Sequence, residues 1–199
     1  MKNTILTMCL VMLAGCSGSW VTDYGTGIEA SVSQGWNVTE VTVAVPSNLT
    51  TTEANSYAPN ADIVWHEDPA GDRRQQVAAI LQNGIATGAK TLRGNRRVQL
   101  NVTLEEFHAV TPVTRARAPS AVHNISYVIQ VVDARSGEPL TEPQLIRADL
   151  EAYVGGEAFE AVARGETQKV RITRHLAAVT AGWLGIGPDP SRKFSSVGR

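Results

Sequence analysis

Cysteine is nearly absent from this chain of 199 residues, which contains only Cys9 and Cys16. Cys9 lies in an apolar N-terminal segment, and no cysteine follows Cys16. A disulfide-stapled scaffold and a cysteine nucleophile in the body of the protein are therefore excluded. A hydrophobic core must hold the fold instead, and the chain is long enough to bury one.

A surplus of basic charge is also missing. The chain has 18 Lys and Arg against 19 Asp and Glu, a formal net charge of −1 at pH 7. Proteins that bind nucleic acid need a basic surplus, because much of their affinity comes from the release of counterions around phosphates. We therefore expect no nucleic-acid partner. Long apolar runs are missing too, since no stretch reaches the about 18 apolar residues of a transmembrane helix.

Common hydrolase signatures are absent as well, including Gly-x-Ser-x-Gly, Ser-x-x-Lys and His-Glu-x-x-His. The richest polar run follows Trp65 and consists of His66, Glu67 and Asp68. All three can bind a metal ion, but consecutive residues at the end of a strand point in different directions. We therefore expect turn and capping roles for Asp68 and Asp72 rather than a metal site.

The other histidines offer a second possible constellation. His108 ends one predicted strand and His123 begins the next, so a hairpin would bring them near one another. Two neighbouring imidazoles could share a metal ion or respond to pH near 6, although solvated strand ends are the commoner case. Glu105 and Glu106 precede His108, yet one of two consecutive strand residues must face away. With His175 isolated in the last predicted helix, we expect no catalytic residue, cofactor or metal ion.

The N-terminal segment carries the clearest positive signal. Lys2 precedes an apolar stretch at residues 5–14. About ten apolar residues rise only about 15 Å as a helix, half of the hydrocarbon core of a bilayer. The segment is therefore predicted to be a signal peptide, residues 1–15, rather than a membrane span.

The end of this segment, Leu13-Ala14-Gly15-Cys16, resembles the lipobox of bacterial lipoproteins at all four positions. The resemblance implies cleavage before Cys16, diacylation of its thiol and acylation of the new amino terminus. The acyl chains would then anchor the protein in a membrane. An ordinary secretory leader cut a few residues later is the alternative. Ser17 stands where an Asp often marks retention in the inner membrane, so we expect the periplasmic face of the outer membrane.

The rest of the chain divides into three parts. Residues 16–36 are rich in Gly, Ser and Thr and predict a lipidated N-terminus with a flexible tether. Residues 37–185 predict a single α+β periplasmic domain, and residues 186–199 a flexible tail. Adjacent strands joined by turns predict an antiparallel sheet of four to five strands with two helices on one face, in the order β-β-α-β-β-β-α. The expected strands are residues 37–45, 63–65, 98–105, 125–132 and 146–152, and the expected helices are residues 72–92 and 166–184.

The first predicted helix has distinct start signals, because Asp72 can cap it and Gln75 follows three residues later. Gly84 and Gly88 lie one turn apart near its apolar face. Each glycine costs about 1 kcal/mol relative to alanine in a helix, so we expect close packing on the sheet as compensation. Membrane-type pairing of helices through Gly-x-x-x-Gly is disfavoured, because polar residues open the segment.

Four motifs lie along the predicted domain: Asp62-Ile63-Val64-Trp65, Gly71-Asp72-Arg73, Glu106-Phe107-His108 and the run at residues 131–140. Together they resemble an uncharacterised lipoprotein family of alphaproteobacteria, over most of the chain beyond the leader. The resemblance implies no activity. A helix followed by strands that end in an Asp-x-x-(Ser/Thr)-Gly turn is also similar to periplasmic auxiliary lipoproteins of transport and secretion systems. Those proteins act as scaffolds.

Three functions fit these observations. The first is a non-enzymatic accessory or scaffold component of a cell-envelope assembly, anchored through acyl chains on Cys16 and docking an envelope protein. The second is a module that binds a small ligand, lipid or glycan, which needs an apolar cavity opening near Trp65 or Tyr127. The third, a hydrolase or metal enzyme, needs at least two of four side chains to converge within coordination distance. These are His66, Glu67, His108 and His123.

Overall fold

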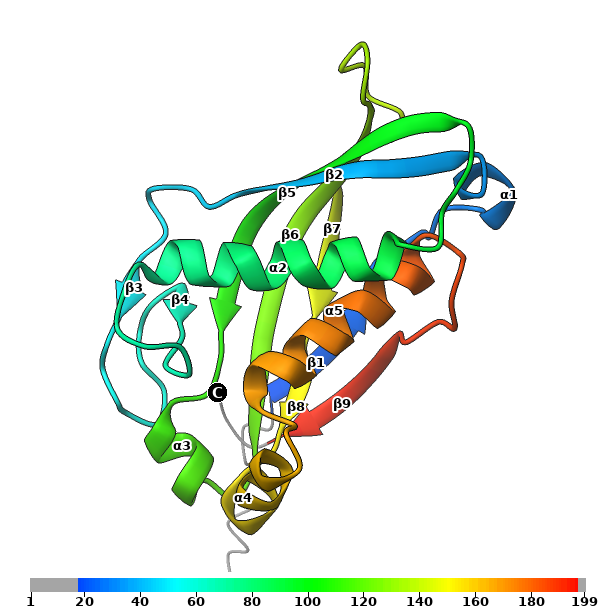
Figure 1. The fold of residues 1–199 in the computed structure, drawn as a ribbon. Coiled ribbons are helices and arrows are strands. Elements are labelled where there is room, and N and C mark those ends of the chain that lie inside the picture. Colours follow the sequence, from blue (N-terminus) through cyan, green and yellow to red (C-terminus); the bar gives the residue numbers. More distant parts are fainter. Residues whose placement is uncertain (1–17, 197–199) are drawn as a thin grey trace, which may run out of the picture.

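The computed structural model describes residues 18–196, in which two long helices lie across one face of a nine-stranded sheet (Figure 1). The α+β class is confirmed. The strands are β1 (Gly18–Asp23), β2 (Trp36–Ala44), β3 (Thr51–Thr52), β4 (Ile63–Val64), β5 (Arg96–His108), β6 (Ala121–Asp133), β7 (Gln144–Ala148), β8 (Leu150–Ala152) and β9 (Arg192–Ser196). The helices are α1 (Ala30–Ser33), α2 (Arg73–Ala89), α3 (Pro112–Arg117), α4 (Gly155–Ala163) and α5 (Gln168–Trp183).

The sheet is mixed, and it has more strands than the four to five predicted. β5, β6 and β7 pair antiparallel, as expected. β2 instead runs parallel to β5, and β3, β4 and β5 are also parallel to one another. The chain reaches β5 from β2 through a crossover that contains α2, and such a connection returns the next strand in the same direction. Alternation of apolar residues reports burial but not strand direction, so the antiparallel prediction was wrong.

The alternating patterns of β5 and β6 do form the centre of the core. Val98, Leu100 and Leu104 in β5 are fully buried beneath the helices. Residues between them, such as Asn101 and Thr103, face solvent on the other side of the sheet. The pairing shifts by one residue between Leu104 and Glu106, which marks a β-bulge. The extra residue shifts the alternation, so the side chains after the bulge point to the opposite faces from those that the pattern before it would give. One side of the sheet is therefore apolar and covered, and the other is polar.

The glycines of α2 face another helix rather than the sheet. Asp72 accepts a hydrogen bond from the Gln75 backbone N–H at 3.2 Å, which confirms the predicted cap. A Cβ atom at Gly84 would lie 2.6 Å from the Cβ of Leu176, and both residues belong to the contact between α2 and α5. Close helix packing therefore compensates the cost of the glycines, and the prediction of packing on the sheet was wrong. The Gly-x-x-x-Gly spacing brings two helices of the core into close contact.

Residues 18–23 form β1 rather than part of the flexible tether predicted for residues 16–36. β1 pairs with β9 along its length and with β7 at its end. The buried carboxylate of Asp149 accepts hydrogen bonds from the Val21 N–H at 3.0 Å and from Asn124 at 2.7 Å. This carboxylate fastens β1 to β6. The apolar residues of β1, Trp20 and Val21, are adjacent rather than alternating, so tertiary pairing decided its structure.

The C-terminal part also differs from the prediction. Residues 192–196, assigned to a flexible tail at 186–199, form strand β9 against β1. The domain predicted at residues 37–185 is therefore extended by one strand on each side. The partner of each strand is distant in sequence, and no local pattern could report it.

Three short helices were not predicted, namely α1, α3 and α4. α3 and α4 lie together at one end of the molecule, and the turn between β6 and β7 lies at the opposite end (Figure 1). Of the helices between residues 18 and 196, none combines the length and apolar character that crossing a membrane requires.

Candidate functional site

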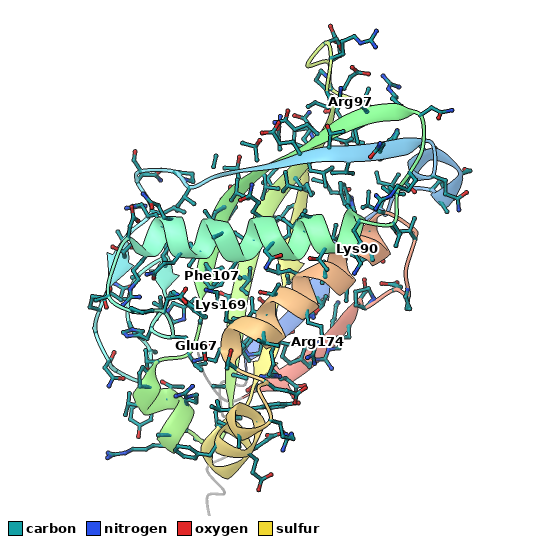
Figure 2. All side chains as sticks on the ribbon, in the orientation of Figure 1. Glu67, Lys90, Arg97, Phe107, Lys169 and Arg174 are labelled. Carbon is teal, nitrogen blue, oxygen red and sulfur yellow. The ribbon has the colours of Figure 1, made fainter. Side chains whose placement is uncertain are left out.

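The polar run after Trp65 holds the first turn of α5 (Figure 2). Glu67 accepts hydrogen bonds from the backbone N–H groups of Gln168 at 3.1 Å and Lys169 at 2.6 Å. A carboxylate there satisfies free N–H groups and interacts favourably with the helix dipole. Asp68 accepts from the Trp65 indole N–H and from the Lys169 ammonium group, each at 2.8 Å. Glu67 therefore caps α5, a role that the sequence did not predict. Asp68, for which a turn or capping role was predicted, bonds two side chains instead.

A second polar pair stands at the start of α2. Arg73 is buried, and its guanidinium donates two hydrogen bonds to the Glu53 carboxylate, at 2.7 and 2.9 Å. The hydrogen bonds from Arg73 lower the pKa of Glu53 despite its partial desolvation. Burial lowers the pKa of His66. These charges connect α2 to the loop before β4, which is a structural role.

His108 and His123 do not form the expected pair. β5 and β6 place His108 opposite Asn124, so His123 points to the other face of the sheet. His108 Nε2 lies 2.9 Å from the Pro59 carbonyl oxygen. His123 is fully buried, and burial, with the nearby charge of Arg171, lowers its pKa to about 3. The hairpin forms as predicted, but the two imidazoles belong to different environments.

His123 has a histidine neighbour that sequence reasoning did not identify. Burial, followed by the charge of Arg192, lowers the pKa of His175 to about 4. The charge of His175 also contributes to the lowered pKa of His123. Both imidazoles are therefore neutral in the folded protein at neutral pH.

The geometries that the second and third candidate functions would need are not seen among the described residues. Throughout residues 18–196, no group of three or more His, Cys, Asp or Glu side chains could hold a metal ion. Trp65 and Tyr127, the expected mouth of a cavity, are 0% and 1% exposed. Trp65 packs edge-on against Phe107, with ring centroids 5.9 Å apart. These rings belong to the core and do not border an opening to solvent.

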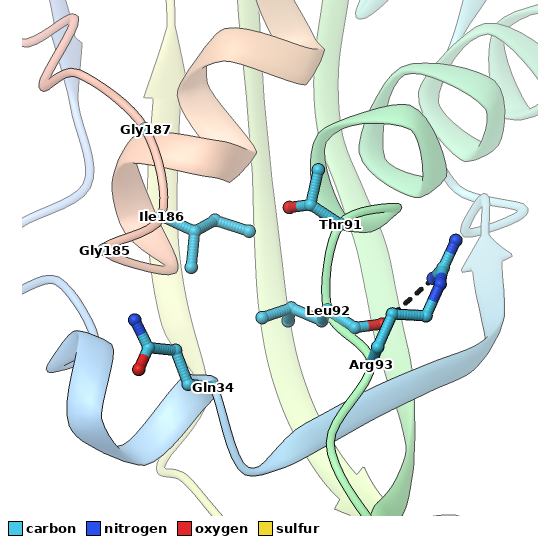
Figure 3. A pocket seen from close by; sticks show the side chains of 7 residues that line it. All are labelled: Gln34, Thr91, Leu92, Arg93, Gly185, Ile186 and Gly187. Atoms are coloured by element: carbon cyan, nitrogen blue, oxygen red, sulfur yellow. Dashed lines mark hydrogen bonds between the residues drawn. The ribbon is translucent and has the colours of Figure 1, made fainter.

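A surface hollow of about 530 Å³ lies elsewhere, between the loop after α2 and the loop after α5 (Figure 3). Its one charged side chain is Arg93, which donates a hydrogen bond to the adjacent Leu92 carbonyl oxygen at 3.0 Å. The remaining lining side chains carry no charge and include two glycines. Ligand sites typically combine an apolar pocket with several convergent polar groups, and this hollow lacks that combination.

Helix α4 presents the most distinctive surface. Phe159 and Val162 are 68% and 44% exposed, while Ala158 and Ala161 on the opposite side are buried. Helical spacing places the exposed apolar residues on one stripe. We call this stripe the α4 outer face, which consists of Gly155, Gly156, Phe159, Val162 and Ala163. Glu157, Glu160 and Arg164 lie on a separate charged face of the helix.

A basic surface occupies the opposite end of the molecule. Arg96, Arg97 and Arg135 are exposed around a hollow of about 510 Å³ at the far end of β5 and β6. Figure 2 shows Arg97 at this end. Arg96 pairs with Asp133 at 3.1 Å, whereas the other two arginines extend the positive charge. We call these three arginines the basic tip.

Sequence reasoning did not identify either surface. The spacing of Phe159, Val162 and Ala163 after two glycines was a usable signal for α4, but no helix was predicted between residues 152 and 166. The basic tip needed the pairing of β5 with β6, because Arg135 is remote from Arg96 and Arg97 in sequence. The predicted lipidation site, Cys16, lies outside the described residues.

Comparison with solved structures gives only remote likenesses. A candidate lipoprotein from Caulobacter crescentus CB15 is 15% identical, with 54% of this chain and 83% of that chain covered and a TM-score of 0.34. An uncharacterised protein is also 15% identical, with 81% and 95% covered and a TM-score of 0.41. The PelC dodecamer from Paraburkholderia phytofirmans is 13% identical, with 81% and 98% covered and a TM-score of 0.29. We infer neither fold nor function from likenesses at these TM-scores.

Among curated proteins, none matches this chain. A family model does match, over residues 36–199, which is most of the chain and includes β2 through β9. The chain therefore belongs to the Family of unknown function (DUF6778).

Proposed function

We propose that the protein is a lipid-anchored lipoprotein on the periplasmic face of the outer membrane, where it is a non-enzymatic scaffold component of an envelope assembly. One observation carries the proposal: the lipobox-like Leu13-Ala14-Gly15-Cys16 ends two residues before β1 begins at Gly18. β1 is fixed in the sheet by β9, β7 and Asp149. Acyl chains on Cys16 would therefore attach to the folded body almost directly.

Direct attachment decides which end of the body lies near the membrane. Two residues span at most about 7 Å, so the membrane lies close to the start of β1. Gly18 pairs with Ser196, which shares a surface hollow with Ala121 at the start of β6. β6 then runs for 13 residues to Asp133 beside the basic tip. A strand of that length extends about 40 Å, so the basic tip would stand well away from the membrane.

The basic tip is the surface best placed to dock a partner. Three exposed arginines around one hollow favour an acidic protein surface, because charge complementarity increases both association rate and specificity. We therefore propose an acidic surface of another envelope protein as the partner. The anchored end and the docking end would then be connected by the continuous strands β5 and β6.

Anchoring is tested by expressing the full chain in a bacterial host that is fed an alkyne-bearing fatty acid. We expect label on the wild-type protein, recovery in the outer-membrane fraction, and loss of both in Cys16→Ser. Acylated protein in the inner-membrane fraction would contradict the proposed outer-membrane location but not the anchoring. An unlabelled wild-type protein in the soluble periplasmic fraction would contradict the proposed anchoring.

Docking is tested by crosslinking the anchored protein in cells, followed by pull-down. We expect Arg96→Glu combined with Arg97→Glu and Arg135→Glu to reduce partner recovery at least tenfold. The control is Arg147→Glu, which reverses one exposed arginine near the end of β7, outside the basic tip. Equal recovery from the triple variant and the control would contradict docking through the basic tip.

A further inference from the structure

The α4 outer face is an apolar surface that the domain leaves largely uncovered, although its edge at Val162 shares a hollow with Arg115 and Arg171. A Cβ atom added at Gly155 or Gly156 would meet nothing within 4 Å. Phe159, one turn further, is 68% exposed, the highest value among the exposed large hydrophobic residues of the described chain. Ala158 and Ala161 already supply the contact of α4 with the body. The outer face therefore contributes little to folding, and it exposes apolar area to water at a cost.

Helix α4 lies at the end of the molecule where the anchor would enter. Gly18 is paired with Ser196, and Ser195 and Ser196 line one hollow with Val154 and Glu157 at the start of α4. Figure 1 shows α4 at this end, beside α3 and β8. With Cys16 only two residues before Gly18, acyl chains attached there would hold α4 close to the membrane surface.

The charges around α4 suit the boundary between lipid and water. Glu160 pairs with Arg164 at 3.9 Å on the separate charged face, where Glu157 is also exposed. Arg117 on the neighbouring α3 is also exposed. Basic side chains near a membrane surface are attracted to anionic headgroups, while an apolar helix face can enter the boundary with the acyl chains.

We propose that the α4 outer face inserts Phe159 and Val162 into the lipid layer that holds the acyl chains of Cys16, as a second contact with the membrane. This inference rests on the proposed lipid anchor. A second copy of the chain is the other occupant to consider. Stable protein interfaces bury about 800 Å² on each partner, more than one stripe of a nine-residue helix offers. Proximity to the anchor therefore favours lipid.

The absence of other thiols makes the proposal directly testable. Once Cys9 is removed with the leader and Cys16 is acylated, Val162→Cys introduces the single free thiol. We would label it with an environment-sensitive fluorophore and reconstitute the acylated protein into phosphatidylethanolamine and phosphatidylglycerol vesicles. Arg135→Cys, at the basic tip, is the matched control. A third variant combines Val162→Cys with Phe159→Ser.

We expect the emission of the fluorophore at residue 162 to shift to shorter wavelength when vesicles are present. Spin-labelled lipids should quench this fluorophore at least threefold more than the fluorophore at residue 135. Phe159→Ser should reduce this difference. Water-like emission at residue 162 in vesicles that retain acylated protein would overturn the inference alone. Shielding at residue 162 without vesicles would indicate a second copy and would also overturn it. Mass spectrometry of the N-terminal peptide separates these outcomes from absent acylation, which would overturn the proposed anchor and the inference together.

Discussion

Two pairs of glycines, one in α2 and one in α4, have very different surroundings. A Cβ atom at Gly88 in α2 would lie 2.4 Å from the Ala177 carbonyl oxygen, so the glycine is required by the contact with α5. At Gly155 and Gly156 in α4, the same atom would meet nothing. The first pair is surrounded by the fold, and the second lies on an apolar face without a partner.

Helices α5 and α4 also differ in how their N-termini and apolar side chains are satisfied. α5 begins with its backbone N–H groups bonded by the Glu67 carboxylate, and its inner residues Ile172 and Leu176 are fully buried. α4 has no side-chain hydrogen bond at its N-cap, Val154, and its largest apolar side chain faces outward. Selection for stability alone explains the α2–α5 contact. The α4 outer face needs an explanation outside the domain.

The largest difference between the two regions is expected from glycine substitutions. Gly88→Leu should lower the free energy of unfolding by more than about 3 kcal/mol, because overpacking displaces the backbone of α5. Gly156→Leu is the matched change in α4, where a Cβ atom meets nothing within 4 Å, and it should stay within about 0.5 kcal/mol of the wild type. Urea denaturation of the two variants would measure both. Similar losses would show that α4 is packed as tightly as α2.

Acidification should destabilise the side of the domain that contains α5. The pKa values of His123 and His175 are lowered to about 3 and about 4, so folding holds both imidazoles neutral. Their contribution to stability is full above pH 7 and is lost as the pH falls from about 6.5 toward 4, because the unfolded chain then binds protons. At pH 5 the loss is about 2 kcal/mol for each histidine. Thermal unfolding between pH 7 and pH 5 would measure it.

The control for this pH dependence is His123→Leu, which removes one titrating group from the core. Its unfolding temperature should fall less between pH 7 and pH 5 than that of the wild type. An unchanged slope would mean that His123 is already accessible to protons in the folded protein.

Removing a carboxylate should destabilise the domain more at α5 than at α4, by a smaller difference than the glycine substitutions give. Glu67→Ala deletes the carboxylate that accepts two backbone hydrogen bonds, and it should cost about 1–2 kcal/mol. Glu160→Ala on α4 removes an exposed carboxylate paired with Arg164 at 3.9 Å, and it should cost less than about 0.5 kcal/mol. Chemical denaturation would compare them. Equal costs would mean that Glu67 is no more important than a surface charge.

The smallest effect on stability is expected at the most exposed aromatic residue. Phe159→Ser should change the free energy of unfolding by less than about 0.5 kcal/mol in the absence of membranes. Leu176→Ala, in the covered contact of α5, should cost about 2–5 kcal/mol. The same denaturation experiment measures both. A loss above about 2 kcal/mol for Phe159→Ser would assign the α4 outer face to the core of the domain.

Local patterns predicted the parts of the fold that they determine. The Asp72 cap, the helical spacing of α2 and the alternation of β5 and β6 were sufficient to locate these elements. Strand direction was not predictable, because the parallel pairing of β2 with β5 depends on the crossover between them. β1 and β9 lack apolar alternation and are ordered by pairing with each other.

Less of the candidate site than of the fold could be predicted from the sequence, because the site depends on contacts between residues that are distant in sequence. The capping role of Glu67 was not predicted, because its target, α5, lies about a hundred positions away in sequence. The basic tip exists because antiparallel pairing brings Arg135 back toward Arg97. The α4 outer face depends on which side of a short helix the domain covers.

Contact between the α4 outer face and lipid is the central claim to be tested. The most direct measurement places a nitroxide at residue 162 of the acylated protein in vesicles, and compares its collisions with oxygen and with a water-soluble nickel complex. We expect oxygen, which concentrates in the acyl chains, to collide more often than the nickel complex at residue 162, with the reverse at residue 135. Dominant collisions with the nickel complex at both residues would contradict the account.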